Sequence, residues 1–526
     1  MADRRMAGRR AGSLVPLFSI PSAESWGIGE IADLPVFARW LREAGLSVVQ
    51  LLPVNEMGDG QTSPYSALSA MAIDPIYISL RALPEFIAWG GESALDDEEL
   101  DRLAAVRAAP GIDYRSVREL KMRCLRDGFE TFLEEEWQRD SPRAREMREY
   151  LEREKWWLDD YAVFRALHNE QEGRHWIEWP APLRDRDAGA LAETKSRLAD
   201  DIRYYSWLQW VAGTQWAQAR ADCGDVAILG DFPFMVSGDS ADVWARQDQF
   251  RIDASVGVPP DAFSETGQDW GLPVYRWDVI AATGDEWLKM RVRRSAALFD
   301  GFRIDHLVGF YRTFVREKGG HTFFVPANEK EQLRQGERLV SIFRDSGAFV
   351  IAEDLGVVPD FVRRSLADLG VPGLKVLRWE RDWNDEGRPF SDPAGYPPLS
   401  VAMSGTHDTE TLAEWWDSAE GEERCRAIEL PALVEGAILA DETYSSRLRD
   451  ALLAVLYGAG SDLVLLPLQD IFGWTERINV PAVVAEHNWT WRLPWPVDSM
   501  RNEPEARERT DFLDRLVRRT RRIPPR

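Results

Sequence analysis

The sequence predicts an α/β fold, a (β/α)8 TIM barrel with helical and loop insertions between its strands. Three observations support this prediction. Eight short apolar runs have the length of buried strands, helical patterns separate several of them, and three of the runs end in a carboxylate. Strands that are buried on both faces read as continuous apolar runs, and a β/α barrel keeps its active site at the C-terminal ends of its strands.

The strand-like runs alternate with helical patterns along much of the chain. Residues 34–44 read as a helix that Gly45 ends, residues 287–298 as a second, and residues 361–369 as a third that Gly370 ends. A repeated strand-then-helix order implies a parallel sheet with right-handed crossovers. Eight such units favour a closed barrel over an open sheet. The runs are residues 13–20, 47–54, 226–234, 301–306, 349–354, 373–379, 399–407 and 463–469.

The uneven spacing of the runs predicts how the chain is divided. We expect residues 1–12, which are basic, to be disordered and the barrel to span residues 13–500. A helical subdomain is expected at about 81–225, where a long stretch rich in Glu, Arg and Trp has helical periodicity. The Gly-, Pro- and Asp-rich connection at about 236–276 has the length of an active-site loop region. Residues 501–526 read as an Arg-rich C-terminal helix and tail.

The composition is that of a globular protein with a strongly acidic balance. The chain has 526 residues, 44% of them hydrophobic, and a net charge of -24. This charge makes nucleic acid and anionic membrane surfaces unsuitable partners. No apolar run approaches the length of a membrane span, and no apolar stretch of signal-peptide type follows the basic N-terminus. Three scattered cysteines indicate a reducing compartment, so we expect a cytoplasmic protein. The sequence leaves the oligomeric state open between a monomer and a weak dimer.

Three carboxylates at strand ends, Asp305, Glu353 and Asp408, are the candidates for chemistry. One alone would mean little, because carboxylates past strand ends are often helix N-caps. Arg303 lies two residues before Asp305, on the same strand face, and can keep that carboxylate ionised. Glu353 has no basic neighbour in its segment, so it can stay protonated and act as an acid. A nucleophile and an acid/base about 5–5.5 Å apart are what retaining glycosyl transfer requires.

Two of the six histidines, His306 and His407, adjoin these carboxylates and could donate hydrogen bonds to sugar hydroxyls. Metal ligation is the rival interpretation of such a cluster, but the sequence has neither H-x-x-x-H nor paired-cysteine spacing. No Gly-rich phosphate-binding loop follows a strand. Most of the 23 tryptophans are expected in the core, although tryptophan also stacks on sugar rings. The residues therefore favour neither a metal site nor a phosphate-binding site.

Short segments spread over nearly the whole chain carry a resemblance to a known family. RIDH (303–306), AEDLG (352–356) and GTHD (405–408) indicate the wide group of α-amylase relatives. DSADVW (239–244) and GVPPD (257–261) narrow the group, and with them the chain resembles the 4-alpha-glucanotransferase (amylomaltase, or disproportionating enzyme) family. The other matching segments are PLFSIPS (16–22), WGIG (26–29), SPY (63–65), GDFP (230–233), GQDWG (267–271), QD (469–470) and NWTWR (488–492).

The resemblance implies a role for each candidate residue. Asp305 corresponds to the nucleophile, Glu353 to the acid/base and Asp408 to the residue that stabilises the transition state. The implied partners are maltooligosaccharides and α-glucans, and the family uses neither metal nor cofactor. The residues that the resemblance places against the substrate are Arg303, His306, His407, Asp261, Trp270, Tyr65 and Asp231.

The chain departs from the family pattern close to these residues. Ala262 stands where the family has tyrosine, Leu272 and Val308 replace an asparagine and an arginine, and residues 479–483 alter an Asn-x-Pro-Gly-Thr stretch. These departures concern acceptor preference, chain-length preference and the balance of transfer against hydrolysis. An α-amylase-like retaining hydrolase of α-1,4-glucans is therefore the alternative function. A glucan-binding protein without catalysis would need damaged carboxylates, and all three are intact.

Overall fold

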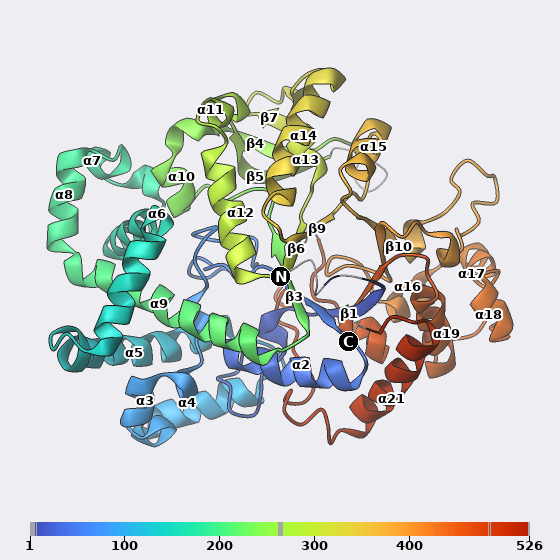
Figure 1. Ribbon diagram of the computed structural model, residues 1–526, viewed down its shortest axis with the longest axis horizontal. Coiled ribbons are helices and arrows are strands. Elements are labelled where there is room, and N and C mark those ends of the chain that lie inside the picture. Colours follow the sequence, from blue (N-terminus) through green and yellow to red (C-terminus); the bar gives the residue numbers. More distant parts are fainter. Residues whose placement is uncertain (1–5, 7, 261–266, 482, 484, 524–526) are drawn as a thin grey trace.

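Eight parallel strands close into a barrel at the centre of the molecule (Figure 1). The structure is a computed structural model that describes residues 6, 8–260, 267–481, 483 and 485–523. The strand order around the barrel is β1-β12-β11-β10-β9-β6-β3-β2, which confirms the predicted (β/α)8 fold. The barrel strands are β1 (Arg10–Leu14), β2 (Val48–Gln50), β3 (Ala227–Phe232), β6 (Gly301–Ile304), β9 (Phe349–Ala352), β10 (Gly373–Val376), β11 (Ser400–Met403) and β12 (Leu463–Pro467).

The first strand begins earlier than the sequence predicts. β1 starts at Arg10, inside the basic segment that we expected to be disordered, and Arg10 is 3% exposed. The backbone N–H of Arg10 donates to the carbonyl of Asp462 (2.7 Å). The buried guanidinium of Arg522 donates to the carbonyls of Arg10 (3.2 Å) and Asp462 (3.3 Å). A residue near the C-terminus therefore ties β1 to the start of β12, a contact that no local pattern reveals.

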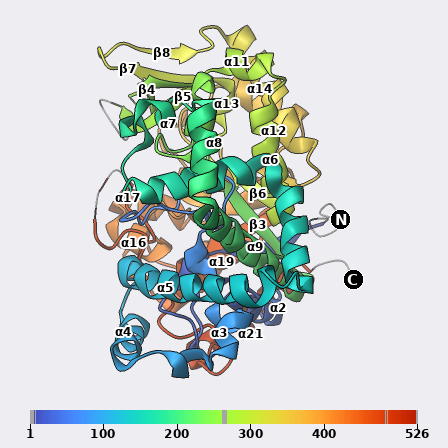
Figure 2. The same cartoon turned by 90° about the vertical axis from the view of Figure 1, so that its left-hand side faces the viewer.

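The helices that follow β2 and precede β3 in the sequence form a layer that covers one side of the barrel (Figure 2). Side-chain caps begin several of them: Asp113 accepts from the N–H of Ser116, and Ser141 accepts from that of Ala144. The longest two, α6 and α9, pack against each other. These helices are α3 (Pro84–Ala88), α4 (Asp97–Ala108), α5 (Tyr114–Phe132), α6 (Pro142–Glu170), α7 (Ala181–Arg184), α8 (Ala188–Arg197) and α9 (Ala199–Asp222).

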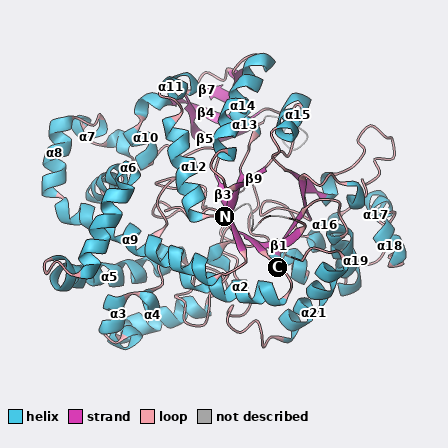
Figure 3. Ribbon diagram, in the orientation of Figure 1, coloured by secondary structure: helices cyan, strands magenta, loops and turns pink. Residues whose placement is uncertain are grey.

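A second, four-stranded sheet stands apart from the barrel strands (Figure 3). Its order is β5-β4-β7-β8, and all its pairs are antiparallel. Its first two strands, β4 (Phe250–Val258) and β5 (Gln268–Tyr275), lie in the connection that the sequence analysis treated as a loop. Glycines, prolines and register shifts hide the alternation that normally marks a strand. The other two strands are β7 (Thr313–Glu317) and β8 (Thr322–Val325).

The remaining helices surround the barrel, and the three that the sequence analysis named are present as α2, α12 and α15. Gly45 and Gly370, with φ of 76° and 68°, follow the ends of α2 and α15 in the left-handed conformation that glycine favours. In the described part of the chain these helices are α2 (Leu34–Glu43), α10 (Ala241–Ala245), α11 (Trp277–Ala282), α12 (Glu286–Leu298), α13 (Val308–Tyr311), α14 (Glu329–Arg344), α15 (Asp360–Asp368), α16 (Leu412–Ser418), α17 (Gly421–Ala427), α18 (Pro431–Glu435), α19 (Ser446–Tyr457), α20 (Leu468–Phe472) and α21 (Pro504–Arg519).

Many of the tryptophans are core residues, as expected from their position in helical patterns. Several pack on other aromatic rings: Trp207 lies against Phe129 and Phe132 of α5, and Trp40 lies against Phe472. Within the described part of the chain, no helix is both long enough and apolar enough to cross a membrane. The tryptophans that are almost fully buried are Trp26, Trp40, Trp176, Trp207, Trp216, Trp244, Trp287 and Trp416.

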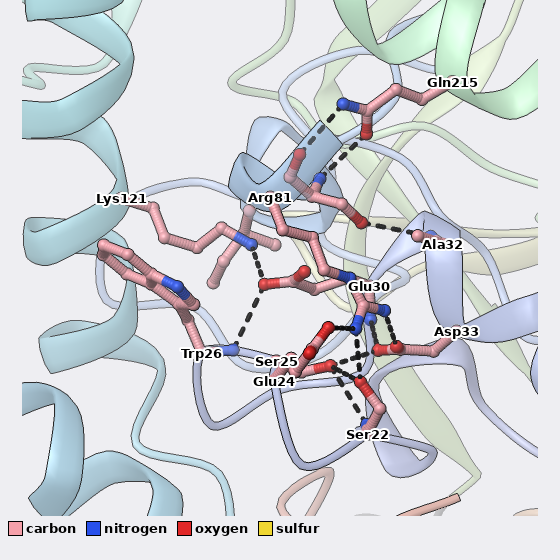
Figure 4. A network of polar contacts seen from close by, with 12 residues as sticks. Ser22, Glu24, Ser25, Trp26, Glu30, Ala32, Asp33, Arg81, Lys121 and Gln215 are labelled. Atoms are coloured by element: carbon pink, nitrogen blue, oxygen red, sulfur yellow. Dashed lines mark hydrogen bonds and ion pairs between the residues drawn. The ribbon is translucent and has the colours of Figure 1, made fainter. Parts of the chain in front are cut away.

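A buried network of charges joins the inserted helices to the loop that follows β1 (Figure 4). Lys121 of α5 and Glu30 of that loop form an ion pair (2.8 Å) in which both side chains are at most 1% exposed. The backbone N–H of Trp26 also donates to Glu30 (3.2 Å). Beside them, Asp33 accepts hydrogen bonds from Arg81 and Ser25. These contacts fix the position of α5 relative to the barrel.

Replacing Lys121 with methionine should destabilise the protein strongly. The change leaves the carboxylate of Glu30 buried without its cation, and breaking such a pair costs about 3–5 kcal/mol. A urea titration that follows tryptophan fluorescence measures the free energy of unfolding. Arg115→Ala is the control, because its ion pair with Glu119 on the same helix is exposed and should contribute nothing measurable. Equal stability of the two variants would contradict the structural role of the buried pair.

Candidate active site

The three candidate carboxylates follow three barrel strands at the same end of the barrel. Asp305 directly follows β6, Glu353 directly follows β9, and Asp408 lies in the loop beyond β11. The register of β6 and β9 pairs Ile304 with Ala352. Asp305 and Glu353 come directly after this pair of residues. They therefore begin two loops that lie side by side. The strand ends bring together residues that are far apart in the sequence.

Arg303 is the buried centre of this arrangement. Its Nη1 donates to both carboxylate oxygens of Asp231 (2.8 and 2.7 Å), and its Nη2 donates to Oδ1 of Asp305 (3.0 Å). The same Nη2 lies 4.0 Å from Oε2 of Glu353. Asp231 faces Arg303 because the register of β3 and β6 pairs the two residues. One guanidinium thus organises three carboxylates.

The carboxyl group of Glu353 favours the protonated form. Burial raises its pKa, and the nearby charge of Asp305 adds to this effect, while the charge of Arg303 and a hydrogen bond from His306 oppose it. The result is a pKa of about 7. The backbone N–H of His306 donates to Oε2 of Glu353 (2.7 Å) and fixes the direction of the carboxyl group. This residue can therefore hold or release a proton near neutral pH.

Asp408 is held as an anion. Burial alone would raise its pKa, but the charge and hydrogen bond of His407, the hydrogen bond of Asn479 and the charge of Arg303 lower the pKa to about 2. Nδ2 of Asn479 donates to Oδ1 of Asp408 (2.6 Å), and Nε2 of His407 lies 3.2 Å from Oδ2. Arg477 donates to the backbone carbonyl of Asp408 (2.9 Å). The carboxylate therefore presents a fixed negative charge.

Tyr65 and His407 connect the two sides of the site. The hydroxyl of Tyr65 donates to Oδ2 of Asp231 (2.9 Å) and lies 3.1 Å from Nε2 of His407. The two rings are stacked, with centroids 5.5 Å apart and planes 19° apart. Burial alone would lower the pKa of His407, but the charge and hydrogen bond of Asp408 raise it above the ordinary value. A chain of contacts thus runs from Asp231 through Tyr65 and His407 to Asp408.

His306 adopts a left-handed backbone conformation, with φ of 42°, which is uncommon outside glycine. Burial lowers the pKa of its imidazole to about 4, helped by the charges of Arg303 and Arg312 and opposed by that of Asp305. The ring is therefore neutral at neutral pH. Trp270 of β5 packs edge-on against it, with centroids 4.8 Å apart. The second sheet reaches the site through this contact.

The structure brings together most of the residues that the sequence analysis named. Trp270 contacts the group at His306, and Asp261 lies outside the described residues. The residues linked by direct contacts are Tyr65, Asp231, Arg303, Asp305, His306, Glu353, His407 and Asp408.

The sequence analysis missed two residues that lie against this group. Asn479 bonds to Asp408, and Trp489 packs on the rings of both Tyr65 and His407 with centroid distances of 5.8 Å. Asn479 was noticed only as part of a divergent stretch. Trp489 belongs to the NWTWR segment that carried the family resemblance, so the dense polar and aromatic pattern there was a usable signal.

The arrangement places two carboxyl groups at different distances from one guanidinium. Asp305 and Glu353 both lie within 4.0 Å of one nitrogen of Arg303, so the two oxygens concerned are at most about 7 Å apart. Such a spacing accommodates the roughly 5–5.5 Å of a retaining glycosidic site. Among the described residues, no cluster of three or more His, Cys, Asp and Glu side chains has the geometry of a metal site.

Comparison with known proteins gives the family. A family model described as 4-alpha-glucanotransferase matches residues 15–498. The chain belongs to the 4-alpha-glucanotransferase family. Membership makes it a glycosyltransferase that acts by transglycosylation, and it does not favour the hydrolase alternative. The resemblance that the short segments indicated is thereby confirmed.

Relatives of this 4-alpha-glucanotransferase family cover nearly the whole chain. The 4-alpha-glucanotransferase of Thermus thermophilus is 35% identical over 92% of this chain and 95% of its own length. The chloroplastic/amyloplastic enzyme of Solanum tuberosum is 31% identical over 96% and 86%. The structure of amylomaltase from Streptococcus agalactiae, in complex with acarbose, has a TM-score of 0.81 at 26% identity and covers 98% of this chain and 99% of its own.

Proposed function

We propose that the chain transfers α-1,4-glucan segments by double displacement, with Asp305 as nucleophile and Glu353 as acid/base. The observation that supports these roles is the contact set of Arg303, whose Nη2 lies 3.0 Å from Asp305 and 4.0 Å from Glu353. The guanidinium orients the carboxylate of Asp305 by a hydrogen bond, whereas Glu353 lies only at ion-pair distance. Glu353, with a pKa of about 7, keeps its proton available. The two carboxyl groups thereby match the division of labour in a retaining mechanism.

In the first half of the reaction, Glu353 protonates the glycosidic oxygen that leaves while Asp305 attacks the anomeric carbon. The bond from that carbon to the leaving oxygen breaks, and a glycosyl ester of Asp305 forms. Positive charge develops on the sugar ring in the transition state. Asp408, whose pKa of about 2 keeps it ionised, stabilises that charge. Arg303, His306, His407, Tyr65 and Asp231 are proposed to bind the reacting glucose and, with Trp270 and Asp261, the neighbouring sugars.

In the second half, the ionised Glu353 removes a proton from the 4-hydroxyl of an acceptor glucan. The acceptor oxygen attacks the anomeric carbon, the ester to Asp305 breaks, and the α-1,4 bond is restored. Transfer exceeds hydrolysis when the acceptor is held in place, because favourable positioning contributes roughly 7–11 kcal/mol. We propose that maltooligosaccharides are donors and that glucose or another glucan is the acceptor. A chain with only three scattered cysteines fits a reducing compartment such as the cytoplasm.

Incubation with maltotriose tests this function. The transferase should produce a ladder of longer maltooligosaccharides together with free glucose, and the total number of reducing ends should stay constant. Thin-layer chromatography and a reducing-sugar assay follow the two quantities. Exclusively shorter products with rising reducing ends would instead identify a hydrolase.

The rate should depend on pH through the proton of Glu353. Because burial raises its pKa to about 7, the protonated form that begins the reaction is lost as the pH rises through that value. We therefore expect kcat/KM with maltotriose to fall above about pH 7, by about tenfold per pH unit at the alkaline end. Initial rates at pH 5–9 and constant ionic strength measure this. A flat profile up to pH 9 would contradict the assignment of Glu353 as the acid.

A further inference from the structure

Trp489 has a backbone conformation that a bulky side chain seldom adopts. Its φ is 65°, in the left-handed region, and the residue is 7% exposed. Such a conformation persists only where the surrounding structure holds it, and it is often found at functional sites. The indole ring lies against Tyr65 and His407, with both centroid distances 5.8 Å. Trp489 thus packs against Tyr65 and His407, the two residues whose contacts connect Asp231 to Asp408.

The contacts that hold Trp489 come from the inserted helices as well as from the barrel loops. Its backbone N–H donates to the carbonyl of Ile478 (2.8 Å). Its carbonyl accepts a hydrogen bond from the hydroxyl of Tyr114 (2.8 Å), the first residue of α5. The next carbonyl, that of Thr490, accepts from the N–H of Ile112 (2.9 Å). Two consecutive peptide groups are therefore fixed by the connection that enters α5.

The rest of the segment 488–493 is tied to the same surroundings. The guanidinium of Arg492 donates to the carbonyls of Gly27 (3.4 Å), Val106 (3.2 Å) and Arg107 (2.5 Å). The N–H of Leu493 donates to the carbonyl of Ser19 (2.9 Å). The segment is consequently held between the loop after β1 and the end of α4. It has little freedom to shift unless the inserted helices shift with it.

The helix that carries Tyr114 is itself anchored. Lys121 lies seven residues further along α5, so it shares a helix face with Tyr114. Its buried ion pair with Glu30 attaches α5 to the loop after β1 (Figure 4). The ring of Tyr114 also packs edge-on against Phe18, with centroids 6.2 Å apart. The hydroxyl of Tyr114 is thereby presented to Trp489 from a fixed position.

We infer that Tyr114 and Trp489 are positioning residues through which the helical insertion holds Tyr65 and His407, and with them the charge of Asp408. This inference rests on the proposed role of Asp408. A shift of the indole ring would move the imidazole that bonds to Asp408 and the phenol that bonds to Asp231. Small displacements of this kind cost up to roughly 100-fold in rate. The insertion therefore contributes to catalysis as well as to packing.

A direct contact of Trp489 with substrate is the alternative, and the kinetics separate the two. A residue that binds sugar in the ground state raises KM when it is removed, whereas a residue that positions the transition-state charge lowers kcat. Because only 7% of Trp489 is exposed, little of its ring is open to a ligand. We therefore expect the effect in kcat.

The test compares Tyr114→Phe and Trp489→Ala with wild-type enzyme in the maltotriose assay. Tyr114→Phe removes one hydroxyl and keeps the ring, and it should lower kcat about 3- to 10-fold. Trp489→Ala should lower kcat by about 100-fold. KM should change less than about threefold in both variants. In the Trp489→Ala background, Tyr114→Phe should have no further effect on kcat, because its action passes through Trp489.

Matched controls separate positioning from general destabilisation. Tyr161→Phe removes another buried tyrosine hydrogen bond in the insertion, that to Glu56, and Trp491→Ala removes a ring of the same segment that packs on Trp474. Both should keep the wild-type kcat. An equal loss in these controls, a change confined to KM, or additive effects in the double variant would overturn the inference. If Trp489→Ala fails to fold, the kcat and KM of Tyr114→Phe test the inference without it. The wild-type ladder tests the proposed function separately, since it depends on neither substitution.

Discussion

Replacing Asp305 with asparagine should abolish glucan transfer, with kcat falling by at least about 10⁴-fold. The amide has nearly the size of the carboxylate but cannot form the glycosyl ester on which double displacement depends. The fold should persist, because Arg303 keeps its two hydrogen bonds to Asp231. Initial rates of glucose release from maltotriose measure the loss. Mass spectrometry after incubation with a slowly turned-over fluorosugar donor should find the adduct on Asp305 in the wild-type enzyme only.

The control for this prediction is Asp253→Asn on β4. Asp253 is also a strand aspartate next to an arginine, at 3.5 Å from Arg251, but its side chain is 72% exposed and lies on the second sheet. Its replacement should leave the rate unchanged. Substantial turnover by Asp305→Asn, or an adduct on another carboxylate, would mean that the nucleophile has been misassigned.

Replacing Glu353 with glutamine should lower kcat for maltotriose by about 10³-fold, within the range expected for loss of a general acid/base. The glutamine cannot donate a proton to the leaving oxygen or accept one from the acceptor. An α-glucosyl fluoride donor needs no protonation of its leaving group, so the first step should recover with that donor. The alkaline decline of the wild-type profile, which arises from the pKa of about 7, should disappear as well.

Glu380→Gln is the matched control for this second prediction. Glu380 lies shortly after the neighbouring barrel strand β10, but Lys375 neutralises it through an ion pair of 2.9 Å. Its replacement should leave the rate unchanged with maltotriose and with the α-glucosyl fluoride donor. Failure of the fluoride donor to restore the first step of Glu353→Gln would remove the argument that Glu353 acts as the acid.

The barrel and its strand-end carboxylates were predictable because both depend on local sequence. A strand that is buried on both faces must be apolar throughout, so the runs ending in Asp305 and Glu353 stand out. The period-two geometry of a strand also predicted that Arg303 would face Asp305, and the structure has that contact at 3.0 Å. These inferences needed no knowledge of distant contacts.

Features that depend on distant contacts were not predictable in the same way. The strand at Arg10 exists because Asp462 and Arg522 satisfy its backbone, and both lie more than 450 residues away. The strands β4 and β5 contain bulges and glycines that break the alternating pattern. Trp489 reaches His407 only through the folded arrangement of two loops.

The departures from the family pattern at Leu272 and Val308 fall in β5 and α13. Val308 is buried among apolar residues.

The clamp that Arg522 forms on Arg10 and Asp462 has a practical consequence for handling the enzyme. It joins the N-terminal ends of β1 and β12, so Arg10 and Arg522 lie at the barrel rim opposite Asp305 and Glu353. Attachment to a solid support close to Arg10 or Arg522 should therefore leave the rim that carries Asp305 and Glu353 open. Trimming the chain before Arg522, by contrast, should open the seam between the first and last strands and shorten the lifetime of the immobilised catalyst at elevated temperature.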